Sequence, residues 1–167
     1  MANSEVILRR ILGPIRSSIR PLVLAVDITK SLLFQLHIAM DDIKVTKHIY
    51  PSVAKLLGQS QGAVTKSIER LTHICWDSMV DQELTEFYIG RELRQMPTPR
   101  EFLTYLAVYS ELETPFFRAI EEYPHILFQE PAGMQKVLIT TEVYLNDHAP
   151  ESLPAANAIT SGAVSEQ

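Results

Sequence analysis

The stretch that decides the fold is Tyr50-Pro-Ser-Val-Ala-Lys-Leu-Leu-Gly-Gln-Ser-Gln-Gly-Ala-Val-Thr-Lys-Ser-Ile-Glu69. It has the spacing of a helix-turn-helix, in which a small residue stands where two short helices touch. Ala54 is this small residue, Gly58 follows four positions later at the turn, and Val64 comes six positions after that. Pro51 suits the first turn of a helix, and glycine can adopt the positive φ that ends one. The spacing therefore predicts two helices that touch at Ala54 and are joined at Gly58. An ordinary pair of core helices joined by a tight turn would show the same spacing, and this alternative stays open.

The second helix, predicted from about Gln61 to Met79, divides into two faces. Its apolar residues recur every three or four positions and form one inward stripe: Val64, Ile68, Leu71 and Cys75. If the motif binds DNA, the start of the second helix meets base edges and the flanking basic residues meet phosphates. The residues that we expect to face bases are Gln61, Gly62, Ala63, Thr65, Lys66 and Glu69. The residues that we expect to face phosphates are Lys47, Lys55, Ser60, Arg70 and His73. Trp76 is expected to anchor the core or an interface.

The rest of the chain also shows helical signals. Ser4 is predicted to cap a short helix that stops at Gly13, and a longer helix with apolar residues as far as Ile43 is predicted after Pro21. Thr98-Pro-Arg-Glu101 has the residues of a capping box and starts another helix. Two further segments are predicted. Residues 81–96 are expected to form a short helix or an extended connection, and a short helix is expected from Thr114-Pro115 to Tyr123-Pro124.

These signals predict an all-α protein, a compact helical bundle of about six helices that contains the helix-turn-helix and carries a C-terminal extension. The predicted divisions are a DNA-binding domain at 1–112, an extension of unknown role at 113–145 and a disordered tail at 146–167. Within the extension, residues 134–145 fit a strand or a helix equally well. The tail is rich in Pro, Ala, Ser and Asn and has few apolar anchors.

The charge of the chain is uneven. The 167 residues have a net charge of −5, yet residues 44–76 carry five basic side chains and one acid, and residues 77–130 carry eleven acids and four arginines. This pattern predicts one face for an anionic partner on an acidic body. With no run of about 20 apolar residues, no recognisable signal peptide and Cys75 as its single cysteine, the chain is expected to be cytoplasmic and not to bind a membrane.

The segment from Val45 to Trp76 resembles the DNA-binding effector domain of the stage 0 sporulation protein A family of response regulators. The matching residues are Val45-Thr46-Lys47, Tyr50-Pro51, Ala54-Lys55, Val64, Ile68 and Trp76, and Pro97-Thr98-Pro99-Arg100-Glu101-Phe102 resembles the opening of the family's last helix. The resemblance covers about residues 5–112. It implies a six-helix domain that regulates transcription, often as paired copies on repeated DNA sites.

The chain departs from the family at the residues that select the operator. The family uses an Arg, a Glu and a second Arg, and the corresponding residues here are Ala63, Thr65 and Lys66. We therefore expect weakened or altered base recognition. Because the resemblance starts near residue 5, we expect no receiver domain, so control would come from abundance, oligomerisation or the extension.

Two functions follow from the sequence. The leading prediction is a transcription regulator that binds double-stranded DNA, alone or as a homodimer. The alternative is a protein-interaction module that uses the acidic surface or the C-terminal extension to bind another regulator. No catalytic set, metal-spaced cluster or phosphate-binding loop stands out, so neither an enzyme nor a cofactor is expected.

Overall fold

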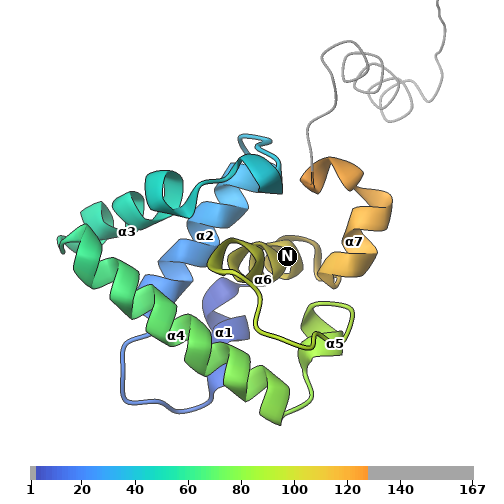
Figure 1. Ribbon diagram of the computed structural model, residues 1–167, viewed down its shortest axis with the longest axis horizontal. Helices are drawn as coiled ribbons and strands as arrows, with labels where there is room; N and C mark the ends of the chain where they lie inside the picture. The colour runs from blue at the N-terminus through green and yellow to red at the C-terminus, as the bar shows by residue number, and fades with distance from the viewer. Residues whose placement is uncertain (1–2, 128–167) are drawn as a thin grey trace, which may run out of the picture. The chain divides into compact units, whose positions relative to one another are not determined.

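The computed structural model describes residues 3–127, and the described residues are helical (Figure 1). Its α-helices are α1 Ser4–Leu12, α2 Arg20–Phe34, α3 Tyr50–Leu57, α4 Gln61–Asp81, α5 Thr85–Tyr88, α6 Pro99–Leu112 and α7 Phe116–Glu122. Three shorter helical turns are η1 Met40–Asp42, η2 Val45–Ile49 and η3 Pro124–Ile126. With seven helices and no strand in residues 3–127, the all-α prediction is confirmed. The predictions for residues 128–145 and for the tail at 146–167 lie outside the described residues.

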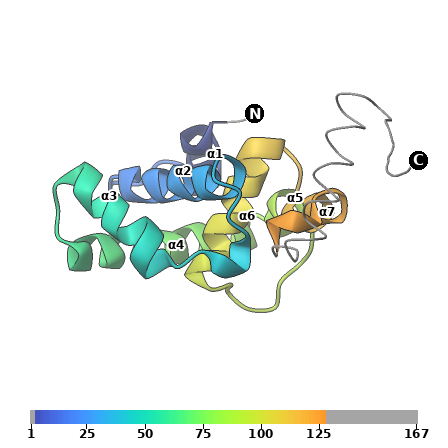
Figure 2. The ribbon, with the colours of Figure 1, turned by 90° about the horizontal axis from the view of Figure 1, so that it is seen from above.

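The central helix of the fold is α2, which contacts α1, α3, α4 and α6 (Figures 1 and 2). Leu22, Ala25 and Val26 on this helix are buried in one hydrophobic core with residues of the other helices. Thr29 is also buried, and its hydroxyl donates to the carbonyl oxygen of Ala25 at 2.7 Å, so this polar group is satisfied inside the core. Since the other long helices pack around α2, its position sets theirs.

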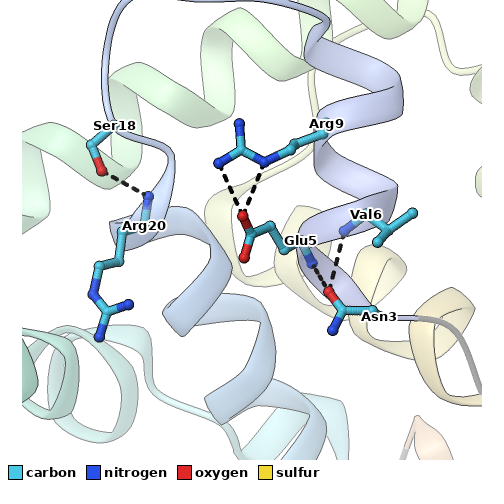
Figure 3. A network of polar contacts seen from close by, with 6 residues as sticks. All are labelled: Asn3, Glu5, Val6, Arg9, Ser18 and Arg20. Carbon is cyan, nitrogen blue, oxygen red and sulfur yellow. Dashed lines mark hydrogen bonds and ion pairs between the residues drawn. The ribbon is translucent and has the colours of Figure 1, made fainter.

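The first helix ends before Gly13 as predicted, but it begins one residue earlier and has a different cap. Asn3 is the N-cap, and its side-chain oxygen accepts hydrogen bonds from the backbone N–H groups of Glu5 at 2.8 Å and Val6 at 3.2 Å (Figure 3). Ser4 lies one residue inside the helix, where it is buried and hydrogen-bonded to the hydroxyl of Ser110 at 3.1 Å. The prediction that Ser4 caps α1 was wrong because Asn3 has the extended backbone of a cap and can reach the free N–H groups.

The second helix is shorter than predicted. It ends at Phe34, and the chain turns away at His37, which has a φ of 55°. Leu36 is exposed, whereas Ala39 and Ile43 are buried with extended backbone on either side of the short turn η1. The apolar spacing up to Ile43 therefore comes from two segments with different backbone conformations.

The capping box of α6 is present as predicted. The Thr98 hydroxyl accepts from the backbone N–H of Glu101 at 3.2 Å, and the Glu101 carboxylate accepts from the backbone N–H of Thr98 at 2.8 Å. On the inward side of α6, Phe102, Leu103 and Leu106 are buried, and Tyr109 and Leu112 are half-buried.

Beyond Leu112 the chain stays on the same core. The predicted short helix is α7, which follows Pro115 as its N-cap and ends before Tyr123-Pro124. Phe116, Ala119 and Ile126 are buried in the core, so residues 113–127 pack with the preceding helices. Between α4 and α6, residues 82–98 form the short helix α5 and an irregular connection, in the segment where a short helix or an extended connection was predicted.

The core position of Cys75 leads to a first prediction. This residue is fully buried on α4, and burial raises the pKa of its thiol from 9.0 to about 12. Because the thiolate is the reactive form, we expect the native thiol to react with a disulfide reagent at pH 8 at least about a thousandfold more slowly than an exposed cysteine. The measurement compares the reaction rates in buffer and in denaturing urea. Equal rates would show that Cys75 is accessible and that α4 is wrongly placed.

Candidate nucleic-acid interface

The turn between α3 and α4 has the geometry that the sequence predicts. Gly58 has φ 65° and ψ 35°, a left-handed conformation that costs glycine no steric clash, and its N–H donates to the carbonyl oxygens of Ala54 and Lys55. The N–H of Gln59 also donates to the carbonyl oxygen of Ala54, at 3.0 Å. These bonds end α3 and redirect the chain within three residues, at Gly58–Ser60, so that α4 starts at Gln61.

The predicted inward residues of the two helices are buried, since Val64 and Ile68 are fully buried and Ala54 is 7% exposed. Val53 on α3 is fully buried as well, and Leu57 is half-buried. The apolar stripe of α4 is confirmed along its length, since Leu71 and Cys75 are fully buried as well. The core therefore fixes which side of α4 faces outward.

Two hydrogen bonds hold the first turn of α4. The hydroxyl oxygen of Ser60 accepts from the backbone N–H of Ala63 at 3.2 Å, so Ser60 is the N-cap of α4. The side-chain amide of Gln61 donates to the backbone carbonyl oxygen of Thr46 at 3.3 Å. Thr46 lies in η2, a π-helical turn closed by the bond from the N–H of Tyr50 to the carbonyl oxygen of Val45. The start of α4 is thus tied to the segment that carries Lys47.

The residues predicted to face DNA lie on the outward side of α4 and on its neighbours. Of those predicted to meet bases, Thr65 is half-buried and the other five are exposed: Gln61, Gly62, Ala63, Lys66 and Glu69. All five predicted phosphate contacts are exposed: Lys47, Lys55, Ser60, Arg70 and His73. Trp76, which was expected to anchor either the core or an interface, is buried in the core.

Glu69 brings the one acidic charge of this surface close to the start of α3. Burial, and secondarily the negative charge of Glu69, raise the pKa of Tyr50 to about 12. The buried Tyr50 hydroxyl has no hydrogen-bond partner among residues 3–127. Tyr50 therefore stays neutral at physiological pH, and its ring serves the core.

Arg70 contacts a residue that sequence reasoning missed. Its guanidinium Nη1 donates to the hydroxyl of Ser17 at 3.4 Å, across a separation of 53 residues. Ser17 is exposed in the connection between α1 and α2. No local motif marks it, because the contact arises only from the packing of α1 and α2 against α4.

His48 has a structural contact. Its Nδ1 accepts a hydrogen bond from the backbone N–H of Lys44 at 2.9 Å, which closes the turn that leads into η2. The neighbouring Ser52 hydroxyl donates to the carbonyl oxygen of His48 at 3.1 Å. This half-buried histidine therefore helps to shape the basic segment.

Elsewhere on the described surface, an open depression of about 470 Å³ lies near the start of α6. The residues around it include Arg94, Met96, Glu101 and Tyr105. The carboxylate of Glu101 is already used in the capping box, and burial is the main cause that raises the pKa of Tyr105 to about 12. Within residues 3–127, no cluster of His, Cys, Asp and Glu side chains is arranged to hold a metal ion.

No helix of the described part of the chain has the length and apolar character needed to cross a membrane. Comparison of the chain with models of protein families, with curated proteins and with solved structures found no match. The likeness to sporulation regulators therefore rests on the residues quoted above.

The close contact at Ala54 gives a second prediction. Replacement of Ala54 by Leu puts a large side chain between α3 and its neighbours, and overpacking of this kind lowers the free energy of unfolding by roughly 1–3 kcal/mol. The matched control is Ala63→Leu, because Ala63 is exposed on the first turn of α4 and the same change there should cost less than about 0.5 kcal/mol. Urea denaturation measures both variants. If both midpoints equal that of the parent, the packing of α3 at Ala54 is wrong.

Proposed function

We propose that this protein is a DNA-binding transcription regulator that inserts the exposed face of α4 into the major groove. The observation that carries the proposal is the division of α4 into two faces. The inner stripe through Val64 and Ile68 is fully buried, whereas Lys66, Arg70 and His73 are exposed together on the outer side. The second helix after the tight turn, here the 21-residue α4 with one exposed face, is the element that helix-turn-helix proteins place in the groove.

The charge of this surface supports an anionic partner. The segment 44–76 carries an excess of four positive charges, in a chain whose net charge is −5. Contacts between basic side chains and phosphates release counterions and supply most of the sequence-independent affinity. The acidic segment 77–130 would repel DNA, so approach from the α4 side is favoured.

Base discrimination should be weak. The outer side of the first turns of α4 carries Ala63 and Lys66, with Thr65 half-buried beside them. Alanine has no polar group, and the threonine hydroxyl can make only a single bond to a base edge. The amide of Gln61 would have to release the carbonyl oxygen of Thr46 before it could pair with adenine in the bidentate manner. This arrangement favours binding that depends chiefly on phosphates.

A specific observation also favours the second candidate, a protein-interaction module. Phe87 on α5 is 57% exposed, and its ring lies 5.7 Å from that of Tyr109 and 4.8 Å from that of Tyr88. Exposed Glu83 and Glu86 come from the same segment. An exposed aromatic side chain with acidic neighbours is suited to a partner protein that offers an apolar and basic surface.

Selection of bound sequences from random duplex DNA separates the two candidates. Purified protein is incubated with the pool at low salt, and the bound fraction is sequenced over successive rounds. Retention of DNA supports the transcription regulator. Enrichment of a short sequence motif in the retained DNA would show in addition that α4 selects bases. No retention of DNA at low salt would favour the interaction module.

The proposal predicts a salt-sensitive interaction that depends on the basic surface. The triple variant Lys47→Gln, Lys55→Gln and Arg70→Gln should bind every duplex more weakly. The slope of log K against log salt should fall in magnitude by about 0.9 for each phosphate that the variant no longer neutralises. Fluorescence anisotropy over a salt series measures the slope.

A matched control removes three positive charges from exposed arginines at 91–118: Arg91→Gln, Arg94→Gln and Arg118→Gln. This control should leave the slope unchanged. If the two triple variants bind DNA alike, the surface around α4 is not the DNA-binding face.

The likeness to the sporulation-regulator effector domains gives a test of specificity. We expect the parent to discriminate poorly between the operator of that family and a scrambled duplex of equal length. The triple variant Ala63→Arg, Thr65→Glu and Lys66→Arg should regain part of the preference, since one good bidentate contact contributes roughly 1–3 kcal/mol of discrimination. Anisotropy at one fixed salt concentration measures both affinities.

Circular dichroism checks that this variant folds, which matters because Thr65 is half-buried. A strong preference of the parent for the family operator would mean that other residues select the bases. A folded variant with no gain in preference would mean that α4 does not enter the groove as the family's recognition helix does.

A further inference from the structure

The connection between α1 and α2, residues 13–19, runs beside α4 (Figure 1) and is hydrogen-bonded to it. In the middle of α4, Arg70 donates to the hydroxyl of Ser17 at 3.4 Å. Nearer the end of α4, the carbonyl oxygen of Ile11, in the last turn of α1, accepts from the Ser78 hydroxyl at 2.6 Å and from the Gln82 amide at 2.8 Å. These two bonds hold the end of α1 that leads into the connection, and the bond from Arg70 to Ser17 places the connection itself beside α4.

The backbone of the connection is held at both of its ends. Gly13 ends α1 with a φ of 64°, and Ile19 is buried in the core. The hydroxyl of Ser18 accepts from the backbone N–H of Arg20 at 3.2 Å, at the start of α2 (Figure 3). Between these anchors, the side chains of Arg16, Ser17 and Ser18 are exposed, so they can meet a partner from a fixed backbone.

The connection and the start of α2 carry positive charge. Arg16 and Arg20 lie there with no acidic residue between Glu5 and Asp27, while Arg9 on α1 is paired with Glu5 at 2.9 Å (Figure 3). Because Ser17 contacts Arg70, the neighbouring Arg16 brings a further positive charge to the basic surface around α4 from a segment more than 20 positions before residue 44. Hydroxyl groups and arginine are both common donors to DNA phosphates.

A helix in the major groove has a phosphate backbone on each side of it. The first turn of α4 is hydrogen-bonded to η2, which carries Lys47, through Gln61 and Thr46. The middle of α4 is hydrogen-bonded to the α1–α2 connection through Arg70 and Ser17. The side chain of Arg70 is directed toward this connection, a position that suits contact with phosphate better than contact with a base.

We propose that the α1–α2 connection is a second phosphate-binding flank of the DNA-binding surface. The guanidinium of Arg16 and the hydroxyl of Ser17, next to Arg70, bind one sugar-phosphate backbone, and Lys47 on η2 binds the other. This inference rests on the proposed function. It assigns to the connection a role in affinity and in the orientation of α4, without any role in base selection.

The test measures duplex binding by the full chain over a salt series, with one random-sequence duplex for all variants. Arg16→Gln should weaken binding and lower the magnitude of the salt slope by about 0.9, the value for one phosphate contact. Arg118→Gln is the control, because it removes the same charge from an exposed site on α7. Ser17→Ala should also weaken binding, and less so when Arg70→Gln is already present, because the two side chains are in contact.

The outcomes separate this inference from the proposed function. If Arg16→Gln and Arg118→Gln give the same slope while Lys47→Gln with Lys55→Gln and Arg70→Gln flattens it, the second flank is wrong and the proposed function stands. If the parent shows no salt-dependent binding to duplex DNA, both the proposed function and the second flank are wrong. Since Arg16 is exposed, circular dichroism should show an unchanged fold in its variant.

Discussion

The packing of the inner stripe of α4 is the interaction on which the rest of the structure depends. Val64, Ile68, Leu71 and Cys75 are each fully buried, and α4 contacts α1, α2, α3 and α6. Full burial of one aliphatic side chain contributes about 1.5–3 kcal/mol, so the stripe resists any rotation of the helix about its axis. Such a rotation would also bury the charge of Lys66 without a partner, which is costly. The outward direction of the polar face is therefore a consequence of the core.

The hydrogen bonds around α4 refine a position that the core has already set. The bonds from Gln61 to Thr46 and from Arg70 to Ser17 are long, at 3.3 and 3.4 Å, and both lie at exposed residues, so each contributes little to stability. Their effect is to place two surface segments beside α4. For a partner such as DNA, whose charges lie on both sides of a groove, the placement of flanking charge matters more than the strength of the bonds that achieve it.

Elements with a local signal could be predicted from the sequence, and those decided by distant contacts could not. Pro51 and Gly58 mark the ends of α3, and the capping box at Thr98 marks the start of α6, because each acts on neighbouring backbone groups. The end of α2 at Phe34 was missed because the buried residues that follow, in and beside the short turn η1, continue the apolar spacing outside the α-helix. In the candidate site, the exposed residues of α4 followed from the period of its stripe. Ser17 did not, since its contact with Arg70 spans 53 residues.

The two candidate functions use different helices. The residues proposed to face bases lie in the first half of α4, around Lys66, whereas the exposed ring of Phe87 lies on α5, just after α4 ends at Asp81. At 1.5 Å per residue, Lys66 and Asp81 are about 22 Å apart along the helix axis. Phe87 thus follows the end of α4 that is farther from Lys66. Substitutions on α5 and in the first turns of α4 can therefore test loss of a protein partner and loss of DNA binding separately.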